Sequence, residues 1–253
     1  MLQIIDINKS YGSKKVLNNI NIDFKPGEST AIVGESGSGK TTLAKIIIGL
    51  EKQNSGEILL NNKILQSINK RYFETCAKIQ YIFQDPYSAL EKNFTVLQTL
   101  NETVTICKRN NYDYMSIEDC IINVDKNLLN YLDQKVDILS GGQKQKLCIA
   151  RSLITKPKII IADECTSMLD KKNSEEIFNL LNKIKQEKNI ILISILHEVD
   201  FYSEYWDKIA IFKDGNLLEY SEFKNFYNNA KNIYSKELIE AFKFFKYKGD
   251  QYE

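Results

Sequence analysis

The segment STAIVGESGSGKTTLAKIIIGL, residues 29–50, constrains the fold more than any other part of this 253-residue chain. Its first five residues are typical of a buried strand, and its last ten residues have a helical pattern. Between them GESGSGKT matches the pattern G-x-x-x-x-G-K-[ST]. A glycine-rich turn at this place lets backbone N–H groups surround a phosphate at the N-terminus of the helix. The segment therefore predicts a strand–loop–helix unit with a phosphate-binding loop (P-loop).

Residue types within the loop indicate which ligand it binds. Lys40 is expected to bridge the β- and γ-phosphates of ATP, and the Thr41 hydroxyl is expected to bind Mg²⁺. The residues predicted to bind ATP here are Gly34, Glu35, Ser36, Gly37, Ser38, Gly39, Lys40, Thr41 and Thr42.

Short apolar runs rich in β-branched residues recur along the chain, separated by helical patterns. Asp214-Gly215 predicts a hairpin turn. The runs IIIA and IILISI are apolar throughout, as in parallel strands buried on both faces. The chain is therefore predicted to be α/β, a P-loop core with a mainly parallel sheet plus an antiparallel β part. The predicted strands are residues 2–7, 20–24, 29–33, 56–60, 79–83, 158–162, 190–195 and 208–212.

Residues 94–135 differ from the rest of the chain, because they are polar, rich in Asn and without strong β runs. They predict a helical insert between two parts of one α/β core. We expect a domain over residues 1–230, with its core at 1–84 and 152–230 and a helical subdomain at about 85–151. Residues 231–253 are expected to form a helical C-terminal extension.

Composition limits the possible partners. Lys and Arg number 34 against 33 Asp and Glu, so there is no overall charge to attract nucleic acid, and none is expected as a partner. Five scattered cysteines and a single histidine argue against a disulfide framework or a metal cluster. The apolar runs are far shorter than the ~20 residues that span a bilayer, so any membrane part is expected from another chain.

Two further motifs carry chemistry. IIIADE is an apolar strand that ends in two carboxylates: Asp163 is expected to hold Mg²⁺, and Glu164 to act on a nucleophile. LSGGQKQ, residues 139–145, offers a hydroxyl and two glycines but no carboxylate or histidine. Such donors suit a phosphate better than they suit catalysis.

Together, the P-loop, LSGGQ and the carboxylate-ended strand resemble the ATP-binding subunit of an ABC transporter, over essentially residues 1–245. In that family two subunits pair head to tail, and each LSGGQ segment caps the γ-phosphate of ATP held by its partner. The resemblance thus implies that Ser140, Gly141, Gly142 and Gln143 act in trans, which explains why they include no catalytic side chain.

The resemblance implies roles for four more residues. Tyr11 would stack on adenine, Gln84 would contact Mg²⁺ and the attacking water, and His197 would contact the γ-phosphate. Asp170 would lie in the loop that crosses the dimer interface. Cys165, Met168 and Leu196 stand where the family commonly has proline, alanine and threonine, so altered rate or packing is expected rather than loss of activity. Cys165 is either an oxidation-sensitive point or an inert buried thiol.

Two segments, IFQDPYSAL and FKNFYNNAKNIYSKELIEAF, resemble the ATPases of peptide and nickel importers, although Lys92 replaces a usual proline. This implies three kinds of partner: a second ATPase subunit in a homo- or heterodimer, two transmembrane permeases and, indirectly, an extracytoplasmic substrate-binding protein. It also implies a peripheral location on the cytoplasmic face of the membrane. An exporter ATPase and an ABC ATPase without a transport role remain as alternatives.

Overall fold

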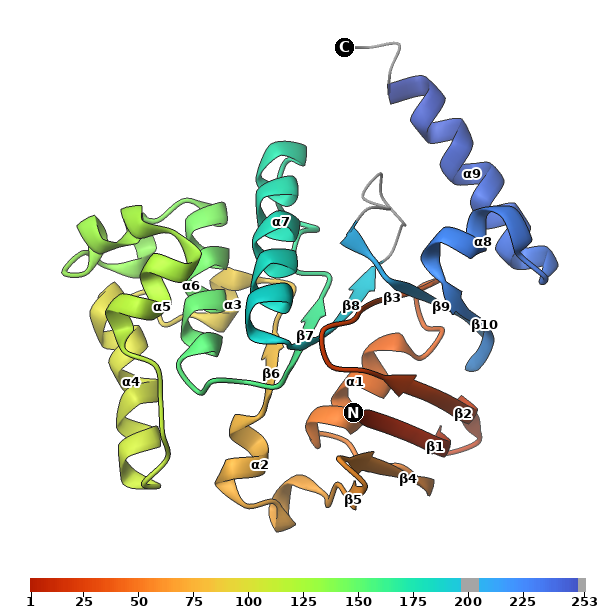
Figure 1. The fold of residues 1–253 in the computed structure, drawn as a ribbon, viewed down its shortest axis with the longest axis horizontal. Coiled ribbons are helices and arrows are strands. Elements are labelled where there is room, and N and C mark those ends of the chain that lie inside the picture. Colours follow the sequence, from red (N-terminus) through yellow and green to blue (C-terminus); the bar gives the residue numbers. More distant parts are fainter. Residues whose placement is uncertain (197–204, 250–253) are drawn as a thin grey trace. The chain divides into compact units, whose positions relative to one another are not determined.

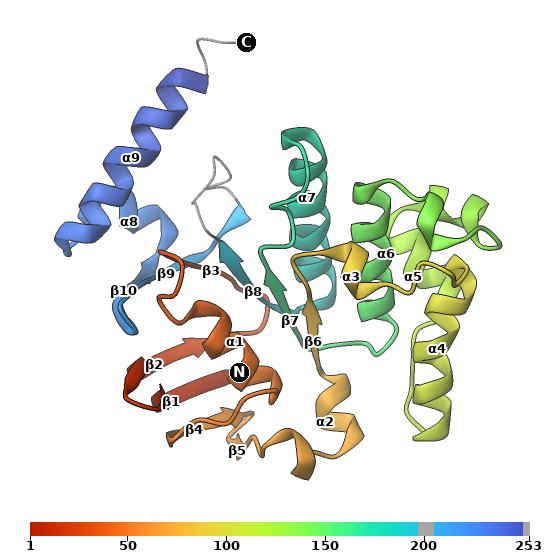
Figure 2. The same cartoon turned by 180° about the vertical axis from the view of Figure 1, so that it is seen from behind.

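The structure is a computed structural model that describes residues 1–196 and 205–249 (Figures 1 and 2). Its strands and helices fall into two compact units, and each is described by itself. The first unit is Met1–Ser67 with Ile193–Glu253, and the second is Ile68–Leu192. Each unit combines strands with helices, so the predicted α/β class is confirmed.

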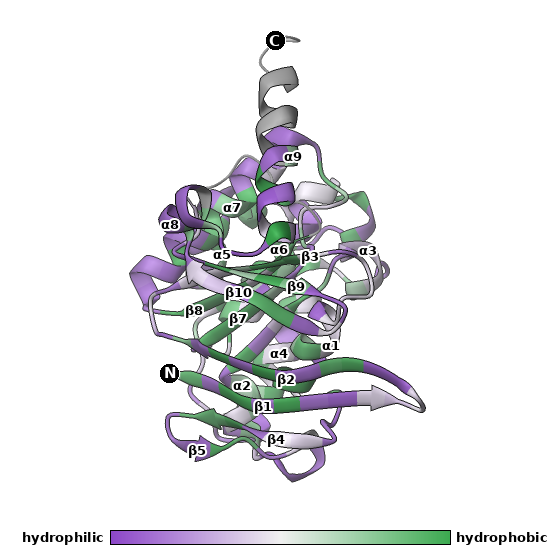
Figure 3. Ribbon diagram, turned by 90° about the vertical axis from the view of Figure 1, so that its right-hand side faces the viewer, coloured by the Kyte–Doolittle hydropathy of each residue, from purple (hydrophilic) through white to green (hydrophobic). Residues whose placement is uncertain are grey.

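A four-stranded antiparallel sheet in the first unit has the order β2-β1-β4-β5. Strand β1 pairs with β2 on one side and with β4 on the other, with Leu2 opposite Phe24 and Leu60. Apolar and polar residues alternate along much of β1 and β2 (Figure 3), and most of the apolar ones are buried, although Ile5 is 36% exposed. The strands are β1 Leu2–Tyr11, β2 Lys14–Phe24, β4 Ser55–Leu60 and β5 Lys63–Ile64.

A second set of strands in the first unit has the order β10-β9-β3-β8. Strand β3 is buried along its whole length and pairs in parallel with β9, while β10 turns back antiparallel to β9. The turn is Asp214-Gly215, where both residues have positive φ, as predicted for a two-residue hairpin. The strands are β3 Ser29–Gly34, β8 Ile191–Leu196, β9 Lys208–Lys213 and β10 Asn216–Glu222.

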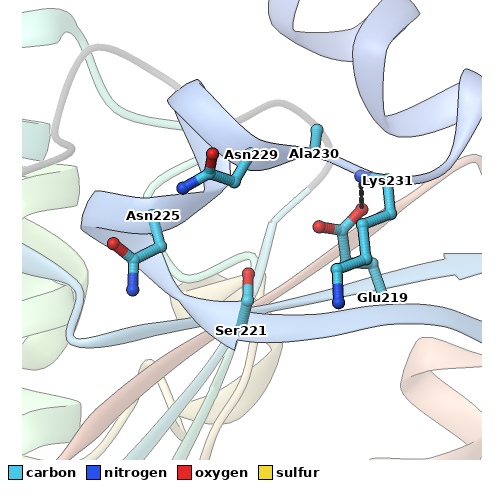
Figure 4. A pocket seen from close by; sticks show the side chains of 6 residues that line it. All are labelled: Glu219, Ser221, Asn225, Asn229, Ala230 and Lys231. Atoms are coloured by element: carbon cyan, nitrogen blue, oxygen red, sulfur yellow. Dashed lines mark hydrogen bonds between the residues drawn. The ribbon is translucent and has the colours of Figure 1, made fainter.

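Three helices complete the first unit. Helix α1 (Lys40–Ile48) follows the P-loop and ends at Gly49 in the left-handed conformation. Helices α8 (Phe223–Asn229) and α9 (Ile233–Gly249) follow β10, and α8 buries two phenylalanine rings. Between β10, α8 and the residues that follow α8 lies a cavity of about 600 Å³ (Figure 4). None of the predicted site residues lines it; the lining residues are Glu219, Ser221, Asn225, Asn229, Ala230 and Lys231.

In the second unit, the strands are hydrogen-bonded in the order β8-β7-β6. The boundary between the units falls within β8, after Leu192. Strands β6 (Ile79–Ile82) and β7 (Ile159–Asp163) pair in parallel, with Tyr81 opposite Ile161. All five residues of β7 are buried, as expected for a strand covered on both faces. Parallel pairing of β3 with β9 and of β6 with β7 agrees with the predicted mainly parallel sheet.

Helices make up the remainder of the second unit. The stretch predicted to be helical holds α4, which begins at a Thr95–Gln98 capping box, and α5, which begins at Ser116. In the described part of the chain, no helix is long and apolar enough to cross a membrane. The α-helices are α2 Phe73–Ala77, α3 Pro86–Ala89, α4 Val96–Arg109, α5 Ile117–Val124, α6 Gly141–Leu153 and α7 Lys171–Lys188. Short 3-10 helices lie at η1 Ile68–Lys70, η2 Lys126–Tyr131 and η3 Val136–Ile138.

Candidate nucleotide-binding site

The P-loop of the first unit follows β3 and begins α1. Its first glycine, Gly34, lies opposite Phe212 of β9, and a Cβ atom there would lie 2.0 Å from the Phe212 carbonyl oxygen. At Gly39, which has a φ of +104°, a Cβ would lie 2.6 Å from the Val16 carbonyl oxygen. Glycine is therefore required at both positions for the loop to fit against its neighbouring strands.

Lys40 and Ser38 give the P-loop its polar character. Lys40 is 4% exposed, and its Nζ donates to the carbonyl oxygens of Gly34 and Glu35 at 2.6 and 2.8 Å. The buried Ser38 Oγ has no hydrogen-bond partner. The N-cap residue of α1, Gly39, provides no side-chain hydrogen bond, and the first turn of the helix has no acidic residue. A buried cation, an orphaned hydroxyl and an uncapped helix N-terminus fit an anion such as the phosphates of ATP.

The hairpin turn between β9 and β10 supports the P-loop from the side. The N–H of Gly215 donates to the Ser38 carbonyl at 3.2 Å, and the Gly215 carbonyl accepts from the N–H of Asn18 at 2.8 Å. The sequence predicted the turn, but this support depends on contacts between distant segments and has no local signal.

Tyr11, the residue expected to stack on adenine, is the last residue of β1 and is 46% exposed. The Nζ of Lys9 lies 4.6 Å from the centre of its ring, and it also forms a 3.1 Å ion pair with Glu51. The hydrogen bond from Lys9 holds the pKa of Glu51 below its usual value. Lys9, which belongs to no recognisable motif in the sequence, holds the Tyr11 ring by a cation–π contact.

In the second unit, the two carboxylates of IIIADE lie at the end of β7. Asp163 is almost fully buried, and the hydroxyl of Tyr81 on β6 donates a short hydrogen bond to its Oδ2. Burial, followed by this hydrogen bond, raises the pKa of Tyr81, so it remains a donor at neutral pH. Glu164 follows with a φ of +48°, a left-handed conformation that non-glycine residues rarely adopt. Backbone strain of this kind clusters at functional sites.

Gln84 lies in the same unit, just after β6. Its side-chain amide donates to Ser167 Oγ at 3.3 Å, which connects it to the loop after Glu164. The N–H of Ser167 in turn donates to the Glu164 carbonyl at 3.0 Å. Gln84 and Glu164 are thus joined through one serine.

The LSGGQ segment forms the start of α6. Ser140 and Gln143 form a capping box, in which Ser140 Oγ accepts from the Gln143 N–H and the Gln143 side chain accepts from the Ser140 N–H. The buried Lys144 Nζ donates to the Asp137 and Leu139 carbonyl oxygens and lies 4.8 Å from the centre of the Tyr87 ring. These contacts hold the turn that presents the segment.

Asp170 lies beside this turn. Its carboxylate caps α7 by accepting from the Asn173 N–H at 2.8 Å and side-chain amide at 2.7 Å, and these bonds lower the pKa of Asp170. A Cβ on Gly142 would lie 2.8 Å from Asn173 Oδ1, so Asn173 links the Asp170 loop to the LSGGQ segment.

The remaining residues singled out in the sequence are Cys165, Met168, Leu196 and His197. Cys165 is buried, and burial raises the pKa of its thiol to about 12, which favours the inert thiol over the oxidation-sensitive one. Met168 is exposed and Leu196 is buried. His197 lies outside the described residues. The P-loop and Tyr11 belong to the first unit, whereas Gln84, Asp163, Glu164, Asp170 and LSGGQ belong to the second.

Comparison with known proteins gives matches over most of the chain. A family model described as "ABC transporter" matches residues 17–167. A probable ABC transporter ATP-binding protein, PEB1C of Campylobacter jejuni, is 36% identical, over 91% of this chain and 94% of the relative. The oligopeptide transport ATP-binding protein OppF of Streptococcus pyogenes is 32% identical, over 95% and 81% respectively. A tyrosine transport ATP-binding protein of Clostridioides difficile is 31% identical, over 96% and 99%.

Solved structures are similar in fold. CbiO1 of Clostridium perfringens, part of the ABC transporter complex cbiONQ, has a TM-score of 0.79 and 29% identity, over 90% of each chain. The ADP conformation of MJ1267, an ATP-binding cassette of an ABC transporter, has a TM-score of 0.78 and 26% identity, over 93% of this chain and 98% of that one.

Proposed function

This chain belongs to the ATP-binding family of ABC transporters, whose members are ATPases, and from this premise we propose that it energises an importer of the peptide/nickel type. The likeness to OppF, whose name specifies oligopeptide transport, supports the peptide part. A relative named for tyrosine transport has a similar sequence identity, 31%. We therefore propose that the transported substrate is a peptide or an amino acid. Nickel stays a prediction of the sequence alone.

One observation carries the nucleotide-binding part of the proposal. The P-loop holds a buried Lys40, the unpartnered Ser38 hydroxyl and an uncapped helix N-terminus in one place. The Ser38 hydroxyl would gain a partner when the phosphates of ATP are bound, and Lys40 and the helix N-terminus would supply positive charge beside them. An anion-binding role therefore explains why these three features lie together.

In the proposed mechanism, the residues position ATP and stabilise charge that develops on the transferred phosphoryl group. Lys40 would contact the β- and γ-phosphates, and on the family resemblance Thr41 and Asp163 would be the residues that hold Mg²⁺. When bound, Mg²⁺ neutralises charge on the phosphate oxygens. Glu164 polarises the attacking water, and Gln84 orients it. His197 is assigned to the γ-phosphate on the family resemblance alone.

The proposal extends to the assembly. Two ATPase subunits pair head to tail, and Ser140, Gly141, Gly142 and Gln143 of one subunit cap the γ-phosphate held by the other, with Asp170 at the interface. Closure with ATP and opening after hydrolysis would shift two permeases between states. The chain would then be a peripheral protein on the cytoplasmic face of the membrane.

Lys40→Ala tests the nucleotide site. We expect purified Lys40→Ala protein to lose ATP binding, or to hydrolyse ATP at least ~10²-fold more slowly, because an electrostatic donor to the phosphates is removed. Lys183→Ala, which removes an exposed lysine of α7, serves as the matched control and should behave as the parent. Undiminished ATP hydrolysis by Lys40→Ala would refute the P-loop assignment.

The identity of the neighbouring genes distinguishes an importer ATPase from an exporter ATPase. Two permeases, a second ATPase and a secreted binding protein would support import. A neighbouring permease without any binding protein would favour the exporter alternative.

A further inference from the structure

The contact between Tyr81 and Asp163 is the strongest feature that the family resemblance does not explain. The two residues lie on neighbouring parallel strands, β6 and β7, and the Tyr81 hydroxyl donates to Asp163 Oδ2. Asp163 is buried and Tyr81 is half-buried, and the centre of the Phe83 ring lies 4.8 Å from that of Tyr81. Packing against Phe83 therefore helps to fix the Tyr81 ring in the position from which it donates to Asp163.

We propose that Tyr81 is a positioning residue for Asp163, which orients the carboxylate toward the Mg²⁺ that accompanies ATP. This inference rests on the proposed function, because it assigns Asp163 to Mg²⁺. One carboxylate oxygen, Oδ2, accepts from the phenol, and the carboxylate cannot rotate without breaking this part-buried hydrogen bond. Tyr81 therefore restrains the direction in which the carboxylate faces.

The geometry favours a role in orientation, because the Tyr81 hydroxyl directs its donor at one oxygen of the carboxylate, Asp163 Oδ2. Hydrogen bonds from outer residues to metal-binding carboxylates fix their direction, and loss of such a partner typically lowers metal affinity ~10–100-fold. Tyr81 meets the geometric requirement for such a partner.

Tyr81→Phe tests the proposal because it removes only the hydroxyl. The measurement is ATP binding to the purified full chain, titrated with Mg²⁺ and repeated without it. We expect the Mg²⁺ concentration for half-maximal effect to rise about tenfold, while ATP binding without Mg²⁺ is unchanged. The electron paramagnetic resonance spectrum of Mn²⁺ bound with ATP should also change. Tyr72→Phe, at a tyrosine 85% exposed in the same unit, is the matched control and should leave both readouts unchanged.

A double-mutant cycle shows whether Tyr81 acts through Asp163. In an Asp163→Asn background, Tyr81→Phe should cause no further shift in the Mg²⁺ titration. An equal shift in both backgrounds, or a lower melting temperature with an unchanged Mg²⁺ titration, would overturn the inference and leave Tyr81 a structural residue. Absence of any ATP binding by the parent protein would instead refute the proposed function.

Discussion

At the scale of single residues, the P-loop is fixed by backbone contacts as well as by its ligand-binding groups. Gly34→Ala would place a methyl group 2.0 Å from the Phe212 carbonyl oxygen, which is held in the β3–β9 pairing. We expect the free energy of unfolding to fall by about 3 kcal/mol or more, since a fixed backbone atom must move. Urea unfolding measures this change.

Gly12→Ala is the matched control for this prediction. Gly12 also has a positive φ, +58°, but no atom lies within 4 Å of a Cβ built there. Only the cost of the left-handed conformation remains, about 1–2 kcal/mol. Equal losses for the two variants would show that the β3–β9 contact does not constrain Gly34.

At the scale of helices and strands, features with local signals were predictable from the sequence. The Asp214-Gly215 hairpin and the start of α1 are examples. Each is predicted by a few consecutive residues, the Asp-Gly pair in the first case and the glycine-rich motif in the second. Strand β1 runs to Tyr11, beyond its predicted end at residue 7, because register shifts after Ile4, Ile7 and Lys9 interrupt the alternation.

Contacts between distant segments were not predictable in the same way. The Tyr81–Asp163 hydrogen bond depends on the parallel register of β6 and β7, which are separated by about 80 residues of chain. The contact of Lys144 with the Tyr87 ring depends on how α6 packs against α3. Neither has a signal in its neighbouring residues, so only the folded chain reveals them.

Substitutions at two helix N-caps of the same kind distinguish an effect on stability from an effect on ATP hydrolysis. Ser140 caps α6 and Thr95 caps α4, and each takes part in a capping box. Ser140→Ala and Thr95→Ala should each lower the free energy of unfolding by about 1 kcal/mol. Only Ser140→Ala should also slow ATP hydrolysis, by about 10–100-fold, since a hydrogen bond to a charged phosphate is worth about 1.5–3 kcal/mol.

Thermal unfolding and steady-state ATPase assays provide both readouts. The comparison is matched because the two substitutions remove the same interaction from the N-terminus of a helix in the same unit. If Thr95→Ala slowed hydrolysis as much as Ser140→Ala, the effect would come from helix stability rather than from contact with a phosphate.

At the scale of the whole molecule, the central question is whether LSGGQ acts on the ATP of a partner subunit. Glu164→Gln keeps the size of the side chain but removes the base, so hydrolysis should fall by ~10²–10⁴-fold while ATP binding survives. An ATP-bound dimer should then persist and elute as a dimer from a size-exclusion column. The expected dimer appears only with ATP, because the nucleotide is held between the two subunits.

Adding Ser140→Arg to the Glu164→Gln protein should remove that dimer. The arginine is larger than serine and cannot cap the helix, and its bulk would fill the space proposed for the partner's γ-phosphate. Thr95→Arg in the same Glu164→Gln background is the control, since it also replaces the capping residue of a helix with arginine, but outside the proposed interface. If this subunit pairs only with a sister ATPase, the same test applies to the mixed pair. A Ser140→Arg, Glu164→Gln protein that still dimerises with ATP would show that LSGGQ does not cap a phosphate in trans.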